Sequence, residues 1–281
     1  MTTVRGALAH ARQRGVALLD AQLLLARALA TTRTALIADD ERSLDSEEGE
    51  RWSGWLARRA DGEPLAYLLG EKEFHGLVLE VNADVLVPRP ETELVVDWAA
   101  ELLARGRQPA GAPAAPAVVD LGTGSGAIAL AIKRLHPAAH VIATDASARA
   151  LAVARSNAAR TGLAIELVEG SWWAAVAARR FDVAVANPPY VAAGDAHLAE
   201  LRHEPIAALA SGADGLADLR AIAAGARDHL FMGGWLVVEH GFDQGAAARR
   251  LLADGGLVDV ETRVDFAGHE RATAGRRARA A

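Results

Sequence analysis

The sequence contains no cysteine. This absence excludes disulfide bonds, thiolate-bound zinc and a thiol nucleophile, and it agrees with a reducing cytoplasm, where we expect the protein to act. No apolar run approaches the 18 or so residues that a membrane-spanning helix needs. Basic residues number 30 against 36 acidic ones, a formal charge of −6. A surface that binds nucleic-acid phosphates needs the opposite balance. We therefore expect no membrane association, no direct nucleic-acid binding and no metal.

The 281 residues suffice for two domains, and residues 1–70 have the pattern of a helical one. Asp45 and Glu48 stand three apart ahead of an apolar stripe that includes Trp52, which predicts a capping box and a core tryptophan. Within residues 71–88, Leu77, Leu79 and Val81 alternate with Val78, Glu80 and Asn82 after the turn Phe74-His75-Gly76. This alternation predicts a β-hairpin that connects the domains.

The segment Pro88-Arg89-Pro90-Glu91-Thr92-Glu93 follows. Pro90 suits the first turn of a helix and the acids suit its positive end, so we expect a helix from here to Gly106. Arg89 stands between two prolines that stiffen its backbone. It is either a surface arginine in a rigid turn or a substrate-binding residue. Residues 107–116 are rich in proline and alanine and predict a loop.

Strands and helices alternate after residue 116, which predicts an α/β fold over residues 89–281. The sheet is expected to be mostly parallel, with helices on both faces. Expected strands span residues 117–121, 140–144, 165–168, 183–186 and 235–239, and expected helices span 127–135 and 148–160.

A glycine-rich loop separates the first of these strands from its helix. Glycines let the backbone turn sharply and let a ligand approach closely, and the helix start offers free N–H groups. The second strand ends at Asp145, whose carboxylate can accept hydrogen bonds from a ribose diol. The pattern indicates a bound nucleoside, and at this point a nicotinamide enzyme fits as well. The candidate cofactor-binding residues of the loop are Gly122, Thr123, Gly124, Ser125 and Gly126.

The buried run Val183–Ala186 stops abruptly at Asn187-Pro188-Pro189-Tyr190. The prolines hold the preceding residues extended, so an amide side chain and two carbonyls are displayed rigidly at the sheet edge. A dehydrogenase does not need a fixed amide and two carbonyls at this position, whereas a methyltransferase acting on a planar NH2 group does. Hydrogen bonds to the Asn187 oxygen and the Pro188 carbonyl would orient that nitrogen and favour its tetrahedral form. Tyr190 can pack against the planar group.

The methyl donor for such a reaction would be S-adenosylmethionine, with S-adenosylhomocysteine as its product. Transfer from the sulfonium is an in-line displacement in which the protein mainly positions two reactants.

With both motifs read, the chain resembles the PrmC/HemK family, the N(5)-glutamine methyltransferases of peptide chain release factors. The resemblance covers almost the whole length, through the segments 20–25, 62–67, 88–93, 187–190, 212–216 and 239–241. It implies a Rossmann-like S-adenosylmethionine-dependent domain behind a helical substrate-recognition domain. It also implies methylation of the glutamine in the release factor's Gly-Gly-Gln motif, which modulates translation termination.

The resemblance also implies roles for single residues. The loop from Gly122 to Gly126 would bind the cofactor and Asp145 its ribose. Asn187 would contact both cofactor and substrate, and the glutamine would bind at Asn187–Tyr190, with Asn187, Pro188 and Tyr190 as the catalytic group.

Adenine recognition is where the sequence departs from the family pattern. Trp172 would stack on the adenine, and the adjacent Trp173 is the alternative. Ser171 stands where the family pattern has an aspartate that touches the adenine amino group, and a serine hydroxyl can still accept one hydrogen bond.

Two other readings stay open. A nucleic-acid methyltransferase acting on the exocyclic amine of adenine, cytosine or guanine could use the same Asn187 loop, although the acidic balance argues against it. A binding module that kept the fold without catalysis is argued against by the intact glycine loop, Asp145 and Asn187. An assay of methyl transfer to release factor, DNA and RNA distinguishes the nucleic-acid methyltransferase from the release factor methyltransferase. A titration with the cofactor tests whether the protein is only a binding module.

Overall fold

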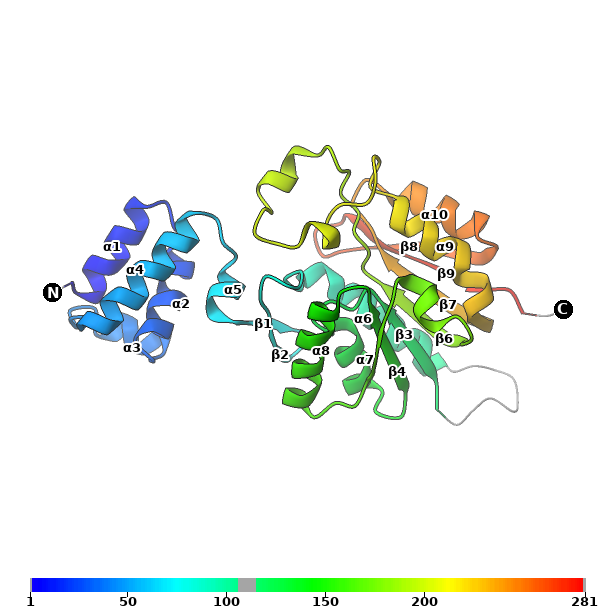
Figure 1. The fold of residues 1–281 in the computed structure, drawn as a ribbon, viewed down its shortest axis with the longest axis horizontal. Helices are drawn as coiled ribbons and strands as arrows, with labels where there is room; N and C mark the ends of the chain where they lie inside the picture. Colours follow the sequence, from blue (N-terminus) through cyan, green and yellow to red (C-terminus); the bar gives the residue numbers. More distant parts are fainter. Residues whose placement is uncertain (1, 106–114, 280–281) are drawn as a thin grey trace. The chain divides into compact units, whose positions relative to one another are not determined.

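The computed structural model describes residues 2–105 and 115–279. It divides into two compact units, Met1–Glu71 and Lys72–Ala281 (Figure 1). The expected helix end at Gly106 and most of the expected loop 107–116 lie outside the described residues.

The first unit is helical. Asp45 caps its fourth helix with a capping box, because Asp45 Oδ1 accepts from the Glu48 N–H at 2.8 Å and Glu48 Oε2 accepts from the Asp45 N–H at 3.0 Å. Trp52 is 4% exposed and packs in the core of this unit. Both expectations are confirmed. The helices are α1 (Val4–Gln13), α2 (Leu18–Ala28), α3 (Arg33–Ala38), α4 (Ser46–Ala60) and α5 (Leu65–Leu69).

The expected hairpin forms from β1 (Glu71–Phe74) and β2 (Leu77–Glu80). Apart from Glu71, it belongs to the second unit, and its Phe74, Leu77 and Leu79 are buried in that unit's core. The Glu80 N–H also donates to Asn157 Oδ1 at 2.6 Å, which ties the hairpin to helix α8 (Ala148–Thr161).

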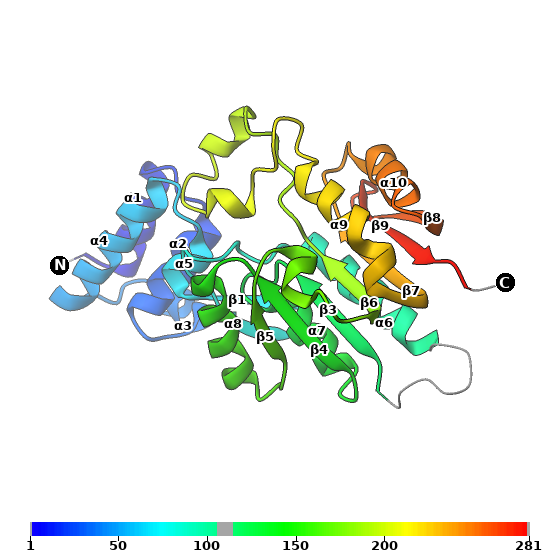
Figure 2. The same cartoon turned by 45° about the vertical axis from the view of Figure 1, so that its right-hand side comes forward.

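Within the described residues, seven strands form the sheet of the second unit in the order β5-β4-β3-β6-β7-β9-β8 (Figure 2). The strands from β5 to β7 in this order pair in parallel, so the mostly parallel α/β fold is confirmed. Strands β8 and β9 are antiparallel additions that the sequence pattern did not reveal. The strands are β3 (Ala117–Leu121), β4 (His140–Asp145), β5 (Glu166–Glu169), β6 (Phe181–Ala186), β7 (Leu230–Glu239), β8 (Leu257–Val264) and β9 (Glu270–Arg277).

Helices cover both faces of this sheet, as a parallel sheet requires to bury its apolar strands. Alternate residues of β3 show the division, since Val118 joins the core under one helix layer and Val119 the core under the other. Helices α6 (Glu93–Arg105) and α7 (Ala127–Leu135) lie on the first face with α8. Helices α9 (Ala217–His229) and α10 (Gly245–Asp254) lie on the second.

The carboxyl ends of the central strands meet at one edge of the sheet. Leu121 pairs with both Thr144 and Ala186, and Ala186 pairs with Val238. The next residues along each strand therefore gather at this edge, which is where open α/β sheets bind ligands.

Candidate active site

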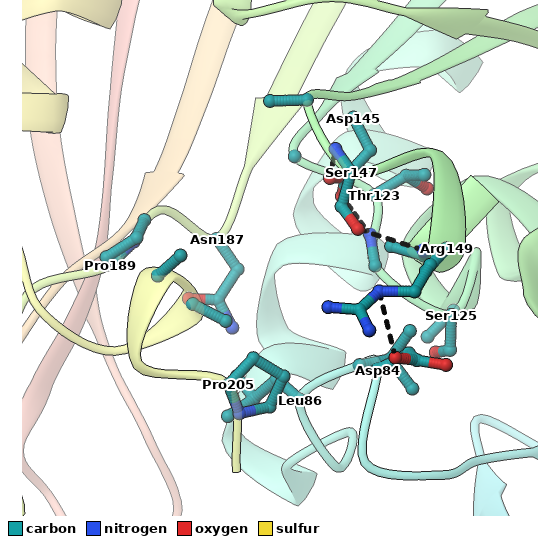
Figure 3. A pocket seen from close by; sticks show the side chains of 18 of the residues that line it. Asp84, Leu86, Thr123, Ser125, Asp145, Ser147, Arg149, Asn187, Pro189 and Pro205 are labelled. Carbon is teal, nitrogen blue, oxygen red and sulfur yellow. Dashed lines mark hydrogen bonds and ion pairs between the residues drawn. The ribbon is translucent and has the colours of Figure 1, made fainter.

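A cavity of about 470 Å³ opens at this edge, and its walls come from the second unit (Figure 3). It brings together most of the residues that the sequence singled out: Gly122, Thr123, Gly124, Ser125, Asp145, Trp172, Asn187 and Pro189. Gly126, Pro188, Tyr190 and Arg89 are not among the described residues that line it.

The glycine loop adopts backbone angles that favour glycine. Gly122 has φ of 74°, and a Cβ there would approach the Trp172 ring to 3.0 Å. Gly126 has φ of 85° and is the N-cap of α7, where a Cβ would press on Ala154 and Leu130 at 3.3 Å. Gly122 thus keeps the cavity open, whereas Gly126 allows close packing behind it.

Asp120, in strand β3, holds the glycine loop in place through hydrogen bonds. Its Oδ2 accepts hydrogen bonds from Thr123 Oγ1 at 2.6 Å and from the Ala129 N–H at 3.2 Å. The side chain is fully buried, and burial raises the pKa of its carboxyl to about 7. The contacts of Asp120 with Thr123 and Ala129 appear only in the fold.

Asp145 lies opposite Asn187 in the cavity (Figure 3). Its Oδ2 accepts from the Gly124 N–H at 2.9 Å, and its Oδ1 accepts from the Ser147 N–H at 2.8 Å. A carboxylate has about four lone-pair positions. Asp145 can therefore fix the glycine loop and still accept hydrogen bonds from a ligand.

The two adjacent tryptophans face different surroundings. Trp172 lines the cavity and donates from Nε1 to Asp218 Oδ1 at 3.2 Å. Trp173 is 7% exposed, donates to the Ile222 carbonyl at 2.7 Å and stacks on His229 with ring centres 4.9 Å apart. Of the two rings, only that of Trp172 is part of the cavity wall, and Ser171 lines the cavity beside it.

Asn187 has one satisfied end and one free end. Its Nδ2 donates to Thr92 Oγ1 at 3.1 Å. Its Oδ1 is buried and has no hydrogen-bond partner among the described residues. A buried acceptor without a partner is costly, and Asn187 lines the cavity, so its Oδ1 is a candidate acceptor for a ligand that donates to it.

Tyr190 is not among the described residues that line the cavity. Burial, together with the nearby Glu239 carboxyl, raises the pKa of Tyr190 to about 12, so the phenol stays protonated. Its backbone carbonyl accepts from Gln244 Nε2 at 3.0 Å. Contact between the ring and a substrate stays a prediction.

Arg89 forms an ion pair with Glu204, with Nη2 and Oε1 2.5 Å apart. The Glu204 side chain is 2% exposed and also accepts from the Val87 N–H at 3.1 Å. The next residue, Pro205, lines the cavity. In the structure Arg89 therefore anchors a segment of the wall.

Three charged wall residues had no signal in the sequence. Asp84 and Arg149 form an ion pair at 3.3 Å on the side of the cavity away from Asn187 (Figure 3). Asp218 reaches the cavity from α9. They carry no motif and come from separate elements, so only the fold brings them together.

Residues 2–105 and 115–279 contain no group of three or more histidine, aspartate or glutamate side chains placed to hold a metal ion. No helix among them is both long and apolar enough to cross a bilayer.

Comparison with known proteins identifies both units. The family model "Methyltransferase small domain" matches residues 92–212, and "PrmC N-terminal domain" matches residues 4–70. A methyltransferase of Pyrococcus furiosus has a similar structure, with a TM-score of 0.54 at 19% identity over 80% of this chain and 99% of that one, which shows the shared fold.

Two curated relatives are much closer in sequence. The release factor glutamine methyltransferase of Burkholderia pseudomallei is 48% identical over 267 residues, covering 92% of this chain and 91% of that protein. That of Bordetella pertussis is 47% identical over 264 residues, covering 93% and 95%. With the glycine loop, Asp145 and a free Asn187 acceptor around one cavity, these matches show that the chain belongs to the family of release factor glutamine methyltransferases.

Proposed function

We propose that the protein transfers a methyl group from S-adenosylmethionine to the side-chain amide nitrogen of the glutamine in the Gly-Gly-Gln motif of peptide chain release factors. The observation that carries this proposal is the unpartnered Oδ1 of Asn187, a residue that lines the cavity. An amide NH2 group can donate to such an acceptor. The reaction belongs in the cytoplasm, where release factors meet the ribosome.

The cavity fits S-adenosylmethionine in size and in chemistry. Its volume lies within the range of small-molecule sites. The loop from Gly122 to Ser125 offers a close backbone approach, Asp145 keeps acceptors for the ribose hydroxyls, and Trp172 offers a ring face for the adenine. When bound there, the cofactor supplies an electrophilic methyl group on its sulfonium.

Residues of this chain then act on the glutamine. One N–H of the glutamine donates to Asn187 Oδ1, and the second donates to the Pro188 carbonyl. These bonds withdraw the nitrogen from conjugation and aim its lone pair, which lowers the barrier because they strengthen as the nitrogen becomes tetrahedral. The bound cofactor would supply the methyl group and leave as S-adenosylhomocysteine, and the methylated nitrogen would lose one proton to water.

The first unit, residues 1–71, is proposed to recognise the release factor. The described cavity walls come from residues 83–218, so the helical unit contributes nothing to them. The separate family match over residues 4–70 agrees with a distinct role.

The proposal is tested by incubating the protein with labelled S-adenosylmethionine and purified release factor, DNA or RNA. We expect label on the release factor, and peptide mass analysis should locate one methyl group on the Gly-Gly-Gln glutamine. Label on DNA or RNA in place of the release factor would show that the nucleic-acid methyltransferase reading is right.

A further inference from the structure

The loop Asn187–Tyr190 contains two prolines, which limits how the fold can hold it. Pro188 and Pro189 have no N–H group and cannot donate backbone hydrogen bonds. Such a loop has to be fixed through its carbonyl groups and its side chains. The ladder of β6 ends just before it, at Ala186, which pairs with Val238 of β7. The contacts beyond that point therefore decide where the acceptors of the loop lie.

Side chains from two other segments hold the ends of this loop. At the first end, Asn187 Nδ2 donates to Thr92 Oγ1 at 3.1 Å. At the other end, Gln244 Nε2 donates to the Tyr190 carbonyl at 3.0 Å. Proline rings fix φ at both intervening residues, so the middle of the loop has few free torsions. Holding the two ends therefore restricts the Pro188 carbonyl, the second acceptor proposed for the substrate amide.

The peptide group between Tyr190 and Val191 is held on both sides. Its N–H, from Val191, donates to the Leu209 carbonyl at 2.9 Å, and its carbonyl oxygen accepts from Gln244. A peptide group that keeps only one of these two bonds can turn about it. The bond from Gln244 therefore contributes to the single orientation of the loop's end.

The side-chain amide of Gln244 has partners at both of its ends. Its Oε1 accepts from the Gly241 N–H at 2.9 Å. Its Nε2 donates to the carbonyls of Tyr190 and, at a longer 3.4 Å, of Gly215. A flipped amide would place donor against donor and acceptor against acceptor, so these partners leave one arrangement. Gln244 thus joins three segments of the chain in one defined geometry.

The segments 212–216 and 239–241 belong to the family resemblance, and neither contributes to the described cavity wall. Gln244 links both of them to Tyr190. Gly215 has φ of 73°, and a Cβ there would lie 2.3 Å from the Tyr190 carbonyl oxygen and 2.9 Å from Gln244 Nε2. Glycine permits this close approach of two backbones. The Tyr190 carbonyl is therefore tightly enclosed.

The turn that carries Gly241 is itself fixed to β9. His240 is fully buried, its N–H donates to the Arg271 carbonyl at 2.9 Å, and its Nε2 lies 2.8 Å from Thr273 Oγ1. The Gln244 N–H also donates to the Gly241 carbonyl at 2.9 Å. Gln244 therefore extends from a rigid base, so its side chain can hold the loop rather than follow its motion.

Helix stability does not account for a glutamine at this position. Gln244 is the N-cap of α10, but its side chain makes no cap hydrogen bond with that helix. Serine, threonine, aspartate and asparagine are the residues that stabilise a helix there. Contact with the loop does account for it, because the longer amide side chain reaches the Tyr190 carbonyl.

Building on the proposed function, we propose that Gln244 is a positioning residue for methyl transfer, whose amide keeps the substrate acceptors of the loop Asn187–Tyr190 in place. Gln244 is not among the described residues that line the cavity, so it acts through the loop. Its effect falls on turnover because those acceptors work by alignment, and a displacement of about 1 Å can cost on the order of 100-fold. The affinity for S-adenosylmethionine should not depend on it.

Gln244→Met is the first test, with full-length protein and release factor as substrate. Methionine has a similar length but cannot donate to the Tyr190 carbonyl. We expect kcat to fall about 10- to 100-fold, because alignment in the transition state is lost. The KM for release factor and the calorimetric Kd for S-adenosylmethionine should stay within about twofold. Wild-type kcat overturns the proposal, and so does an equal loss of cofactor affinity, which would give Gln244 a purely structural role.

Lys133→Met is the matched control. Lys133 is half-buried like Gln244, and its Nζ donates to two carbonyls, those of Pro137 and Ala139, each at 2.8 Å. These contacts lie just before the amino end of β4, at the sheet edge opposite the cavity. We expect this variant to keep the wild-type kcat. An equal fall in kcat for both variants would mean that a general loss of stability explains the effect, which overturns the proposal.

Gln244→Glu is the second test and decides the matter even if methionine disturbs the fold. Glutamate keeps the length and can still accept from the Gly241 N–H, but an ionised carboxylate cannot donate to the Tyr190 carbonyl. Assays at about pH 8, well above the ordinary glutamate pKa of about 4.3, favour the ionised form. Circular dichroism checks the fold. We expect kcat to fall about 10-fold or more, and a wild-type kcat overturns the proposal.

The wild-type protein separates this inference from the proposed function. A wild-type protein that leaves release factor unmethylated would overturn both. Active wild-type protein whose Gln244 variants keep full turnover would overturn the positioning role alone.

Discussion

The Gly124 N–H donates a 2.9 Å hydrogen bond to Asp145 Oδ2. This bond joins the loop after β3 to the end of β4, so one carboxylate shapes the glycine loop and faces the cavity at the same time. Removing Asp145 should therefore weaken the cofactor site in two ways, by freeing the loop and by removing acceptors for the ribose.

Asp145→Ala should weaken S-adenosylmethionine binding by about 1.5–3 kcal/mol, which is about 10- to 100-fold in Kd, because hydrogen bonds to a charged group are lost. Isothermal titration calorimetry measures the change, and circular dichroism checks that the variant is folded. Asp254→Ala, an exposed carboxylate at the end of α10, is the control and should bind as the wild type does. Equal affinity of the Asp145 variant would show that the ribose contact is assigned wrongly.

Trp172→Ala and Trp173→Ala should differ in kind. Trp172 lines the cavity, so its loss should weaken cofactor binding with little effect on unfolding. Trp173 is buried and hydrogen-bonded, so its loss should lower the free energy of unfolding by about 3–5 kcal/mol. Calorimetric affinity and urea unfolding of both variants are the measurements. The opposite pattern would mean that Trp173 is the stacking residue.

Asn187→Ala should reduce turnover with release factor about 100- to 1,000-fold, as removal of an oxyanion-hole donor does in other enzymes. Fold and cofactor affinity should change little, because the backbone is fixed by the β6 ladder and by Pro188. Methyl transfer under saturating cofactor measures the loss. Wild-type turnover in this variant would place the catalytic site elsewhere.

Asn187→Asp is the sharper companion change. It keeps an acceptor but removes the NH2 group that donates to Thr92, and it adds a charge near the buried Glu239. We expect it to be nearly as damaging as alanine. Near-wild-type turnover would mean that Asn187 acts only as an acceptor and that its hydrogen bond to Thr92 does not matter for catalysis.

Arg89→Ala should destabilise the protein by about 2–5 kcal/mol, because it leaves the buried Glu204 carboxylate without its cation. Urea unfolding measures this loss. The double change Arg89→Ala with Glu204→Ala should recover part of the stability, since no buried charge then remains. If the double variant recovers both stability and turnover, Arg89 acts by holding the wall of the site. If it recovers stability but keeps a raised KM for release factor, Arg89 binds the substrate directly.

A chain that starts at Lys72 should bind S-adenosylmethionine with near-full affinity but methylate release factor poorly, because it keeps every described wall residue and lacks the helical unit. Calorimetry and the methyl-transfer assay give the two readings, and full-length protein is the reference. Full-length turnover by the truncated chain would contradict the role proposed for residues 1–71.

The starting residue of that truncation matters. A chain that starts at Asp84 would lose the hairpin, including the core residues Phe74 and Leu79 and the contact from Glu80 to Asn157. We expect this shorter chain to be less stable in urea than the one that starts at Lys72. Equal stability would mean that the hairpin contributes little to the second unit.

Local patterns in the sequence determined much of this protein. Strand Ala117–Leu121 and helix Ala127–Leu135 have the predicted bounds, because an unbroken apolar run and glycine punctuation act over a few neighbouring residues. The capping box at Asp45 is local for the same reason. The glycine loop, Asp145 and Asn187 could be expected together, since parallel strands bring their carboxyl ends to one edge.

Contacts between distant segments were decided only by the tertiary structure. Strand β9 was not predicted, because its sequence lacks a clear apolar alternation. Its buried apolar side chains are those of the small residues Ala272 and Ala274. The partner of Arg89 lies 115 residues away, and that of Asn187 lies 95 residues away. Hydrogen bonds of this kind leave no period or motif in the sequence, because the fold alone brings Thr92 and Asn187 within reach of each other. For that reason the sequence could name Asn187, but only the structure shows that its Nδ2 donates to Thr92 while its Oδ1 has no hydrogen-bond partner among the described residues.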